Sequence, residues 1–412
     1  MNWKYLVLSL IVVLAFSCDP KDEDYEFVQV ATPQLMSKSA FRSAVKVDAP
    51  REIENVGKIY AYKDLIFVGD DGKGIHVIDN SNPTAPQSIK FIEIPRNEDI
   101  SVKNDFLYAD SATDLVVFDI SDINNVSIVE RLEDVFNVYD YAIPLEAQAI
   151  DYGNFDFENE IIVGWSLTTE RRKKVENDIL IDTALNDGSV LSASESTTGT
   201  GGSLARFQIV DHYLYAVGTN EMAIFNIQDL SKPVLANTQY AGWNIETMFQ
   251  AEGYLYLGST NGMYIYSLNN PALPDYVSEF THWEGCDPVV VDGNYAYLTL
   301  RGGNACGQLE SVLEVIDVSD KSKPALVARH ELENPYGLGA KGHSLFVCDG
   351  TAGLKLFDKT NPLEVSFVKS YAEIQAKDVI PLEDKLLMIG GDTLYQYNYV
   401  ENGVELLSTF QL

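Results

Sequence analysis

Acidic side chains return at one position in several successive segments of this chain, where they could hold a cation or exchange protons. When the segments are aligned on their aromatic-rich strands, the carboxylates at this position belong to Asp99, Glu246, Asp287 and Asp378. The residues at the same position of three other segments are Lys58, Arg206 and Tyr336. Facing carboxylates can attract a cation, and oxygen ligands suit calcium if about six to eight of them lie at short range. The pattern therefore predicts a polar ring that is either solvated or occupied by calcium.

Nucleophilic catalysis has little support in the sequence. The five histidines are His76, His212, His282, His330 and His343. None recurs at a position facing a serine or cysteine, no GxSxG elbow is present, and no His–Cys spacing matches a zinc site. We therefore expect no catalytic residue, no metal ligand set and no cofactor. The alternative is a metal-dependent, lactonase-like hydrolase that uses the four ring carboxylates with calcium.

The chain holds four cysteines, which lie in three different parts of the sequence. Cys286 and Cys306 fall in neighbouring loops of one segment, so they form either a disulfide or two separate thiols in an oxidising compartment. Cys348 ends the apolar run Leu345–Cys348 and is expected to be a small buried hydrophobic residue. The remaining cysteine, Cys18, follows an apolar N-terminal stretch.

That N-terminal stretch, residues 1–17, has the layout of a secretory signal: Lys4, then an apolar run from Tyr5 to Phe16 that is too short to span a bilayer. The ending LAFSC resembles the bacterial lipobox, which implies lipidation at Cys18. Residues 18–40 are interpreted as an acidic tether. Its DPKDED stretch resembles an export signal for outer-membrane lipoproteins, and this favours a cell-surface location over the periplasmic face.

Composition narrows the classes of partner. The chain carries 29 basic and 61 acidic side chains, a net charge of −32. Such a surface repels nucleic acid, and no basic stripe is present to offset it. Apart from the signal, no apolar run is long enough to cross a bilayer. We therefore expect contact with a membrane only through the lipid anchor, and a protein or glycan partner in the cell envelope.

The elements that position these residues are set by an apolar motif ending in a small polar residue, which occurs seven times. Its last residues, here called anchors, are Asp79, Asp119, Asn226, Ser267, Asp317, Asp358 and Asn398. The distances between successive anchors are 40, 107, 41, 50, 41 and 40 residues. A period near 40 with strand-like patterning is typical of a β-propeller. The sequence therefore predicts an all-β fold, a single propeller of seven four-stranded blades over residues 41–412.

Blade 2 shows the expected strands most clearly: 100–103, 106–109, 115–120 and 127–131. Turn residues follow the third strand of several repeats, so each anchor is expected to cap the turn to the fourth strand. The first strand of each blade lines the axis of such a ring, which places Asp99, Glu246, Asp287 and Asp378 at the channel mouth. The ring closes either by packing alone or with a strand added by residues 41–47.

The repeats resemble the LVIVD-repeat family of bacterial envelope lipoproteins. The segments that carry the resemblance include GIHVIDNSNP (74–83), DLVVFDIS (114–121), GCDPVVV (285–291) and AKDVIPL (376–382). The resemblance runs from about residue 41 to the C-terminus. It implies the propeller fold and an envelope role, and it implies no particular activity.

Departures from the repeat mark the expected working face. About residues 133–203 are inserted between blades 2 and 3, and 301–310 lengthen a loop of blade 5. Within the larger insertion, 160–167 and 174–181 are predicted to form a hairpin around 168–173, and 186–203 a flexible linker. The basic run 171–174 is either the solvated hairpin tip or a docking point for an acidic partner. The expected binding face comprises Arg206, Trp283, Arg301 and Tyr336, with Trp243 nearby.

These expectations describe a non-catalytic, surface-anchored lipoprotein whose propeller binds a protein or glycan. The ligand, the pathway and the oligomeric state are not determined by the sequence. An eighth blade hidden in residues 133–203 is also left open.

Overall fold

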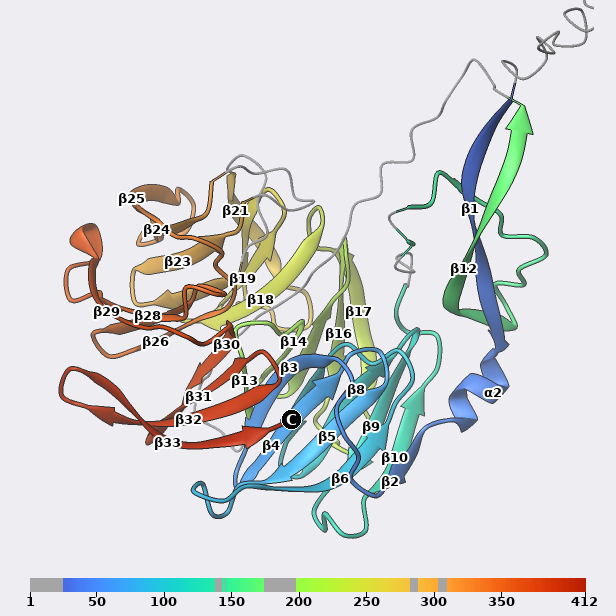
Figure 1. Ribbon diagram of the computed structural model, residues 1–412, viewed down its shortest axis with the longest axis horizontal. Helices are drawn as coiled ribbons and strands as arrows, with labels where there is room; N and C mark the ends of the chain where they lie inside the picture. Colours follow the sequence, from blue (N-terminus) through green and yellow to red (C-terminus); the bar gives the residue numbers. More distant parts are fainter. Residues whose placement is uncertain (1–24, 138–142, 145, 174–197, 282–287, 303–309) are drawn as a thin grey trace, which may run out of the picture. The chain divides into compact units, whose positions relative to one another are not determined.

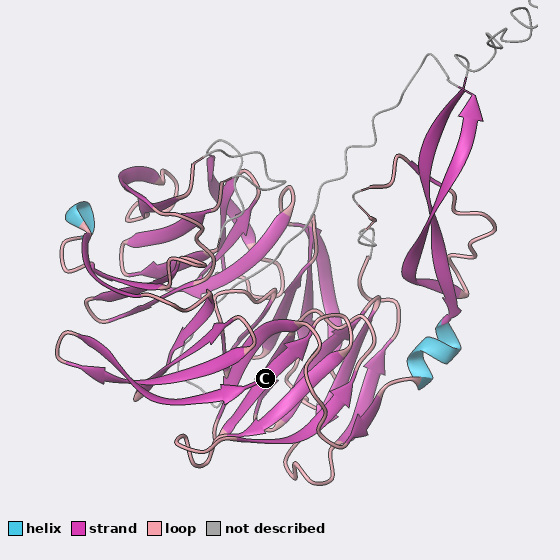
Figure 2. Ribbon diagram, viewed as in Figure 1, coloured by secondary structure: helices cyan, strands magenta, loops and turns pink. Residues whose placement is uncertain are grey.

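Four-stranded antiparallel sheets recur seven times along the chain, as the spacing of the anchors predicts (Figures 1 and 2). The computed structural model describes residues 25–137, 143–144, 146–173, 198–281, 288–302 and 310–412. The chain divides into two compact units: residues 1–38 with 141–183, and residues 39–140 with 184–412. All seven sheets lie in the second unit, so the all-β fold with seven blades is confirmed.

Each blade is a meander of consecutive strands, named A to D from the axis outward. Blade 1 comprises β3 (Val56–Tyr62), β4 (Leu65–Asp70), β5 (Gly74–Asp79) and β6 (Gln87–Glu93). Blade 2 comprises β7 (Ile100–Lys103), β8 (Phe106–Ser111), β9 (Asp114–Asp119) and β10 (Ser127–Leu132). Blade 3 comprises β14 (Phe207–Val210), β15 (Tyr213–Val217), β16 (Glu221–Asn226) and β17 (Val234–Tyr240). The blade 2 strands match those predicted to within two residues.

The remaining blades follow the same order. Blade 4 comprises β18 (Ile245–Ala251), β19 (Tyr254–Ser259), β20 (Gly262–Ser267) and β21 (Asp275–Thr281). Blade 5 comprises β22 (Val289–Asp292), β23 (Tyr295–Leu300), β24 (Val312–Asp317) and β25 (Ala325–Glu331). Blade 6 comprises β26 (Leu338–Lys341), β27 (Ser344–Cys348), β28 (Leu354–Asp358) and β29 (Ser366–Tyr371), with a short 3-10 helix, η2 (Pro362–Glu364), before β29. Blade 7 comprises β30 (Ala376–Pro381), β31 (Lys385–Gly390), β32 (Thr393–Val400) and β33 (Gly403–Gln411).

The core lies between the faces of neighbouring blades. Strands B and C are apolar on both faces because each blade is covered on both sides; in β5, for example, Gly74 to Ile78 are all buried. One buried cluster joins blades 1 and 2, and others join blades 2 and 3, blades 3 and 4, blades 4 to 6, and blades 6 and 7. A single blade could not bury both faces, so the ring supplies the missing cover.

Six of the seven anchors cap turns, as predicted, whereas Asn398 lies within β32 and pairs across the ladder with Glu405. The Asp79 carboxylate accepts a hydrogen bond from the Ser81 backbone N–H at 2.8 Å. Equivalent bonds of 2.8–3.2 Å are accepted by Asp119, Asn226, Ser267, Asp317 and Asp358. Each acceptor satisfies a backbone donor that the turn would otherwise leave without a protein partner. These residues are therefore structural.

The ring closes between blades 7 and 1 without a shared strand. Apolar residues of β3, β4 and β5 pack against those of β30, β31 and β32. At the outer side, the Asn80 and Gln396 side-chain amides donate to each other's oxygens at 3.0 and 2.7 Å, and the Ser408 hydroxyl donates to the Pro83 carbonyl at 2.6 Å. Strand β2 (Lys46–Asp48) pairs with β6 at the outer edge of blade 1, so residues 41–47 do not supply the closing strand.

The first unit contains a long two-stranded ribbon. Strand β1 (Tyr25–Ser37) pairs antiparallel with β12 (Glu160–Lys173), and the short β11 (Ala149–Ile150) pairs in parallel with β1. Two sequence predictions are corrected here. The tether expected over 18–40 includes the strand β1, and residues 168–173 continue β12 instead of forming a hairpin turn. The partner of β12 is thus the N-terminal strand, while 174–181 lie outside the described residues.

The junction between the units includes α2 (Lys38–Ser43). The signal and the lipidation residue Cys18 lie outside the described residues, so both remain predictions. Within the described part of the chain, no helix is long and apolar enough to span a membrane.

Candidate functional site

A segment of the chain itself lies inside the ring. Residues 198–206, here called the axial segment, include β13 (Thr200–Gly201), which pairs with the free inner edge of β3. Thr198 bridges Lys103 of β7, and the Gly199 N–H donates to the Val102 carbonyl at 2.9 Å. Figure 1 shows β13 beside β3 and β30. The flexible linker predicted over 186–203 is therefore wrong for 198–203, while 186–197 lie outside the described residues.

Glycines allow the axial segment to approach the inner strands closely. A Cβ atom on Gly202 would lie 1.8 Å from Oδ2 of Asp378, and one on Gly199 would lie 2.2 Å from the Tyr60 ring. Neither approach leaves room for a side chain. The Gly-rich composition that favours a linker in sequence here permits tight packing at the axis.

The axial segment connects blades 6, 7 and 1. The Asp378 carboxylate of blade 7 accepts hydrogen bonds from the Ser203 N–H and hydroxyl at 2.8 and 2.9 Å. The Ser203 hydroxyl oxygen accepts from the Leu338 N–H of blade 6 at 2.5 Å, and Gly202 N–H donates to the Ile59 carbonyl of blade 1 at 2.9 Å. Asp378 is 1 % exposed, and burial raises its pKa to about 7. This carboxyl is therefore partly protonated near neutral pH.

A second charged group joins blades 1, 2 and 3. The Asp99 carboxylate accepts hydrogen bonds from the Arg206 and Phe207 N–H groups, and its Oδ2 lies 3.5 Å from the Lys58 ammonium. Burial raises the pKa of Asp99 despite these partners. The Arg206 guanidinium donates to Glu98 at 2.6 Å. Burial opposes ionisation of Glu98, but Arg206 and Lys58 outweigh it and lower the pKa of that carboxyl.

The residues of the predicted polar ring that the structure describes lie on their inner strands or within two residues before them. Asp99, Glu246 and Asp378 are at most 6 % exposed, so a solvated channel mouth does not hold for them. Lys58, Glu246 and Asp378 lie at irregularities in the register of their inner strands, where a bulge re-aims a side chain. Asp287 lies outside the described residues. Among the residues that the structure describes, no three His, Cys, Asp or Glu side chains are grouped to hold a metal ion.

The other predicted binding residues are only partly described. The Arg301 guanidinium lies over the Tyr336 ring, 4.2 Å from its centroid, and both side chains are half-buried. Trp283, Cys286 and Cys306 lie outside the described residues, so the disulfide remains a prediction. Cys348 is fully buried and not paired, as expected, and burial raises the pKa of its thiol.

An exposed aromatic patch was not predicted as a unit. It consists of Tyr240, Trp243 and Tyr276, which are 64 %, 55 % and 54 % exposed. Tyr264 and Tyr266 support it from below: the Trp243 N–H donates to the Tyr264 hydroxyl at 3.3 Å, and the Tyr266 ring meets Tyr276 edge-on at 5.7 Å. The sequence signal is the dense aromatic content of 240–243 and 264–276, which packing between blades explains equally well.

Tyr240 ends β17 and Trp243 follows it in the D-to-A connection, whereas Tyr276 is the second residue of β21 and follows the C-to-D turn. The insertion after blade 2 is also a D-to-A connection. Tyr240 and Trp243 therefore lie on the face where the repeat is most altered, and Tyr276 begins its strand at the other end. Exposed aromatic rings with a rigid framework provide contact area at low entropic cost.

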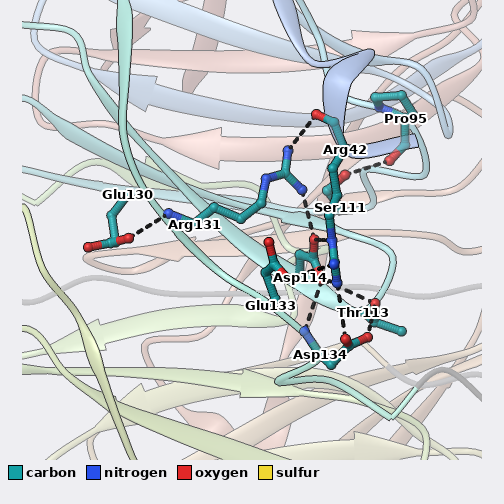
Figure 3. Close-up of polar contacts among 9 residues, drawn as sticks. All are labelled: Arg42, Pro95, Ser111, Thr113, Asp114, Glu130, Arg131, Glu133 and Asp134. Atoms are coloured by element: carbon teal, nitrogen blue, oxygen red, sulfur yellow. Dashed lines mark hydrogen bonds and ion pairs between the residues drawn. The ribbon is translucent and has the colours of Figure 1, made fainter. Parts of the chain in front are cut away.

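A charged cluster on blade 2 was also missed (Figure 3). The Asp114 carboxylate is 1 % exposed and receives two hydrogen bonds from the Arg42 guanidinium, at 2.7 and 3.0 Å. Arg131 and the Asp134 N–H add bonds of 2.9 and 3.0 Å. Burial alone would raise the pKa of Asp114, but Arg42 and its other donors lower it. The cluster fixes α2 against blade 2, which is a structural role.

Comparison with known proteins supports the assignment of the fold. The model of the LVIVD repeat matches residues 55–91, 96–134 and 286–331, which correspond to blades 1, 2 and 5. No curated protein matches the chain.

Several solved structures share the architecture. The periplasmic gluconolactonase PpgL of Pseudomonas aeruginosa is 10 % identical with a TM-score of 0.54, over 87 % of this chain and 97 % of that one. A functionally unknown protein of Desulfotomaculum acetoxidans is 11 % identical with a TM-score of 0.51, over 86 % and 98 %. The computationally designed protein Ika8 is 7 % identical with a TM-score of 0.50, over 88 % and 89 %. Likeness at such low identity shows the fold alone. The chain therefore carries LVIVD repeats in blades 1, 2 and 5 and folds as a seven-bladed β-propeller.

Proposed function

We propose that this chain is a lipoprotein anchored at Cys18 on the outer surface of the outer membrane, and that its propeller is a non-catalytic binding module for a glycan or protein of the cell envelope. The signal layout and the LAFSC sequence support the anchor. The aromatic patch of Tyr240, Trp243 and Tyr276 is the observation that carries the binding role.

The patch suits recognition for physical reasons. Its three rings are more than half exposed, the Tyr276 ring packs edge-on against Tyr266, and the backbone of Trp243 is bonded to the Tyr264 hydroxyl. Aromatic faces stack on the C–H surfaces of sugars or fill pockets of a protein partner. Glu279, paired across the strands with Tyr264, places a carboxylate acceptor beside them for hydroxyl or amide donors.

Metal-dependent hydrolysis receives no support from the ring carboxylates. Asp99 and Asp378 accept backbone hydrogen bonds from neighbouring segments, and this use holds blades together. These bonds occupy Oδ2 of Asp99 and Oδ1 of Asp378, two oxygens that a calcium ion would need.

The binding role is tested with the mature chain and a panel of envelope glycans and surface extracts. We expect binding to quench Trp fluorescence, and Trp243→Ala or Tyr276→Ala to weaken affinity at least tenfold, as is usual for a central aromatic contact. Phe367→Ala is the matched control, because Phe367 is an exposed aromatic of blade 6 with 58 % exposure. An equal loss in the control, or full affinity in both patch variants, would reject the patch as the binding surface.

A further inference from the structure

The free end of the β1–β12 ribbon has two faces of different chemistry. Cross-strand pairs unite Tyr25 with Lys173 and Phe27 with Arg171. Because side chains alternate along a strand, these four residues share one face, here called the tip face. The Arg171 guanidinium lies 4.4 Å from the centroid of the Tyr25 ring, which confirms the shared side. The tip face thus combines two aromatic rings with two cations.

The opposite face has a different charge. It carries Glu26, Val28, Glu170 and Arg172 by the same register. Arg172 is paired with Glu170 at 3.0 Å, so its charge is balanced within the face. With Glu26 added, this face has a net charge of −1, whereas the tip face has a net charge of +2. The contrast is local to one ribbon in a chain whose overall charge is −32.

The two aromatic side chains of the tip face are exposed. Phe27 is 72 % exposed and Tyr25 41 % exposed, although both belong to a regular strand. Aromatic rings flanked by basic side chains are the combination found at the boundary between lipid headgroups and acyl chains. Isolated exposure would need no explanation, but exposure on the only cationic face of the ribbon does.

Chain length brings this end of the ribbon to the membrane. Tyr25 lies seven residue steps after Cys18 along the sequence, a reach of at most about 25 Å. We propose that the tip face of Tyr25, Phe27, Arg171 and Lys173 contacts the anionic surface of the lipid bilayer and so fixes the ribbon on the membrane. This inference rests on the proposed function, because the lipid at Cys18 supplies the proximity.

A competing occupant is the chain's own DPKDED stretch at 19–24, whose net charge is −3. That stretch has no apolar side chain to cover Phe27, whereas a bilayer interface accepts both the ring and the cations. The bilayer is therefore the occupant that matches both the aromatic rings and the cations of the tip face. Occupation of this face by the acidic stretch instead is one of the outcomes that the test distinguishes.

The test tethers the mature chain, residues 19–412 with an N-terminal hexahistidine tag, to vesicles through a nickel-chelating lipid. The vesicles contain brominated phosphatidylcholine with or without an equal amount of phosphatidylglycerol, and bromine quenches tryptophan at the interface. Phe27→Trp places an indole on the tip face, and Val28→Trp places one on the opposite face. We expect added quenching for Phe27→Trp in the anionic vesicles and none for Val28→Trp.

Charge dependence gives the second readout. In the Phe27→Trp background, Arg171→Gln is expected to lower the membrane-bound fraction of the tip about fivefold, the usual worth of one basic side chain at an anionic surface. Arg172→Gln changes the net charge equally but lies on the other face, so we expect less than a twofold change. Equal quenching of both tryptophans, no quenching in anionic vesicles, or equal effects of the two glutamines would overturn the proposal.

The tethered assay does not depend on acylation, which is measured separately by palmitate labelling of cells that express the chain or its Cys18→Ala variant. Unlabelled Cys18 together with face-specific quenching would reject the lipid anchor and keep the tip face. Labelled Cys18 without quenching would keep the lipid anchor and reject the tip face.

Discussion

Replacing Asp378 by asparagine is expected to make the propeller more stable at alkaline pH relative to the natural chain. Asp378 lies buried between β30 and the axial segment, and its Oδ1 accepts hydrogen bonds from Ser203. Its Oδ2 has no hydrogen-bond partner among the described residues. Asparagine keeps an acceptor oxygen for Ser203 and carries no charge, so the substitution removes the titration while it retains the main contacts.

The direction and size of the expected effect on the free energy of unfolding follow from the raised pKa of Asp378. Burial raises the pKa of Asp378 from an ordinary 3.8 to about 7, so between these values the folded chain holds a proton that the unfolded chain has lost. The contribution of this carboxyl to stability is therefore fully present below pH 4 and declines as the pH rises toward 7. Between pH 5 and pH 8 the decline amounts to roughly 3 kcal/mol, an upper figure because the site can relax.

Urea unfolding at pH 5 and pH 8 measures this difference. The free energy of unfolding of Asp378→Asn, taken relative to the natural chain, should rise by up to roughly 3 kcal/mol from pH 5 to pH 8. Asp79→Asn is the matched control: the hydrogen bonds from Ser81 lower the pKa of Asp79, so that carboxylate is ionised in both states throughout this range. Parallel pH profiles for Asp378→Asn and the natural chain would refute the assignment of a protonated carboxyl at the axis.

Two further substitutions test how the ring is held together. Gly202→Ala would bring a methyl group against Asp378, and we expect a loss of about 1–3 kcal/mol in the free energy of unfolding, measured by urea titration; Gly218→Ala, with its nearest atom at 3.9 Å, should change stability by less than about 0.5 kcal/mol. Asn80→Ala leaves the buried Gln396 amide without its reciprocal partner, and calorimetry should show a loss of about 1–3 kcal/mol. Unchanged unfolding in either test variant would contradict the contacts described at the seam.

The repeating part of the fold was predictable because each blade is encoded by the same local pattern of strands and turns. The pattern of apolar strands bounded by polar turns can be recognised within one repeat of about 40 residues. The anchors recur where a turn needs a hydrogen-bond acceptor. Asp79 and Asp119 could thus be assigned as structural caps from sequence alone, and the bonds to Ser81 and Ser121 confirm this role.

The parts that were missed depend on partners distant in sequence. Residues 168–173 are polar and charged, which favours a turn locally, but they pair with β1 well over a hundred residues upstream. The alternation of YEFVQVA over 25–31 was the available signal for that partner strand. Residues 198–203 combine Gly, Ser and Thr, a composition shared by flexible linkers and by segments packed too closely for side chains. Only the positions of Tyr60 and Asp378 distinguish the two.

The place where the axial segment crosses the ring gives the insertion a structural role. A propeller whose first and last blades share no strand must hold that seam by other contacts, since the seam is where the ring could open. On the outer side, Asn80 and Gln396 exchange hydrogen bonds. On the inner side, Gly202 bonds to blade 1 while Ser203 bonds to blade 7. The chain therefore leaves blade 2 for the insertion and, before it begins blade 3, fastens blade 7 to blade 1 from within. The insertion adds no blade to the repeat, but by this geometry it is part of what keeps the seven blades closed.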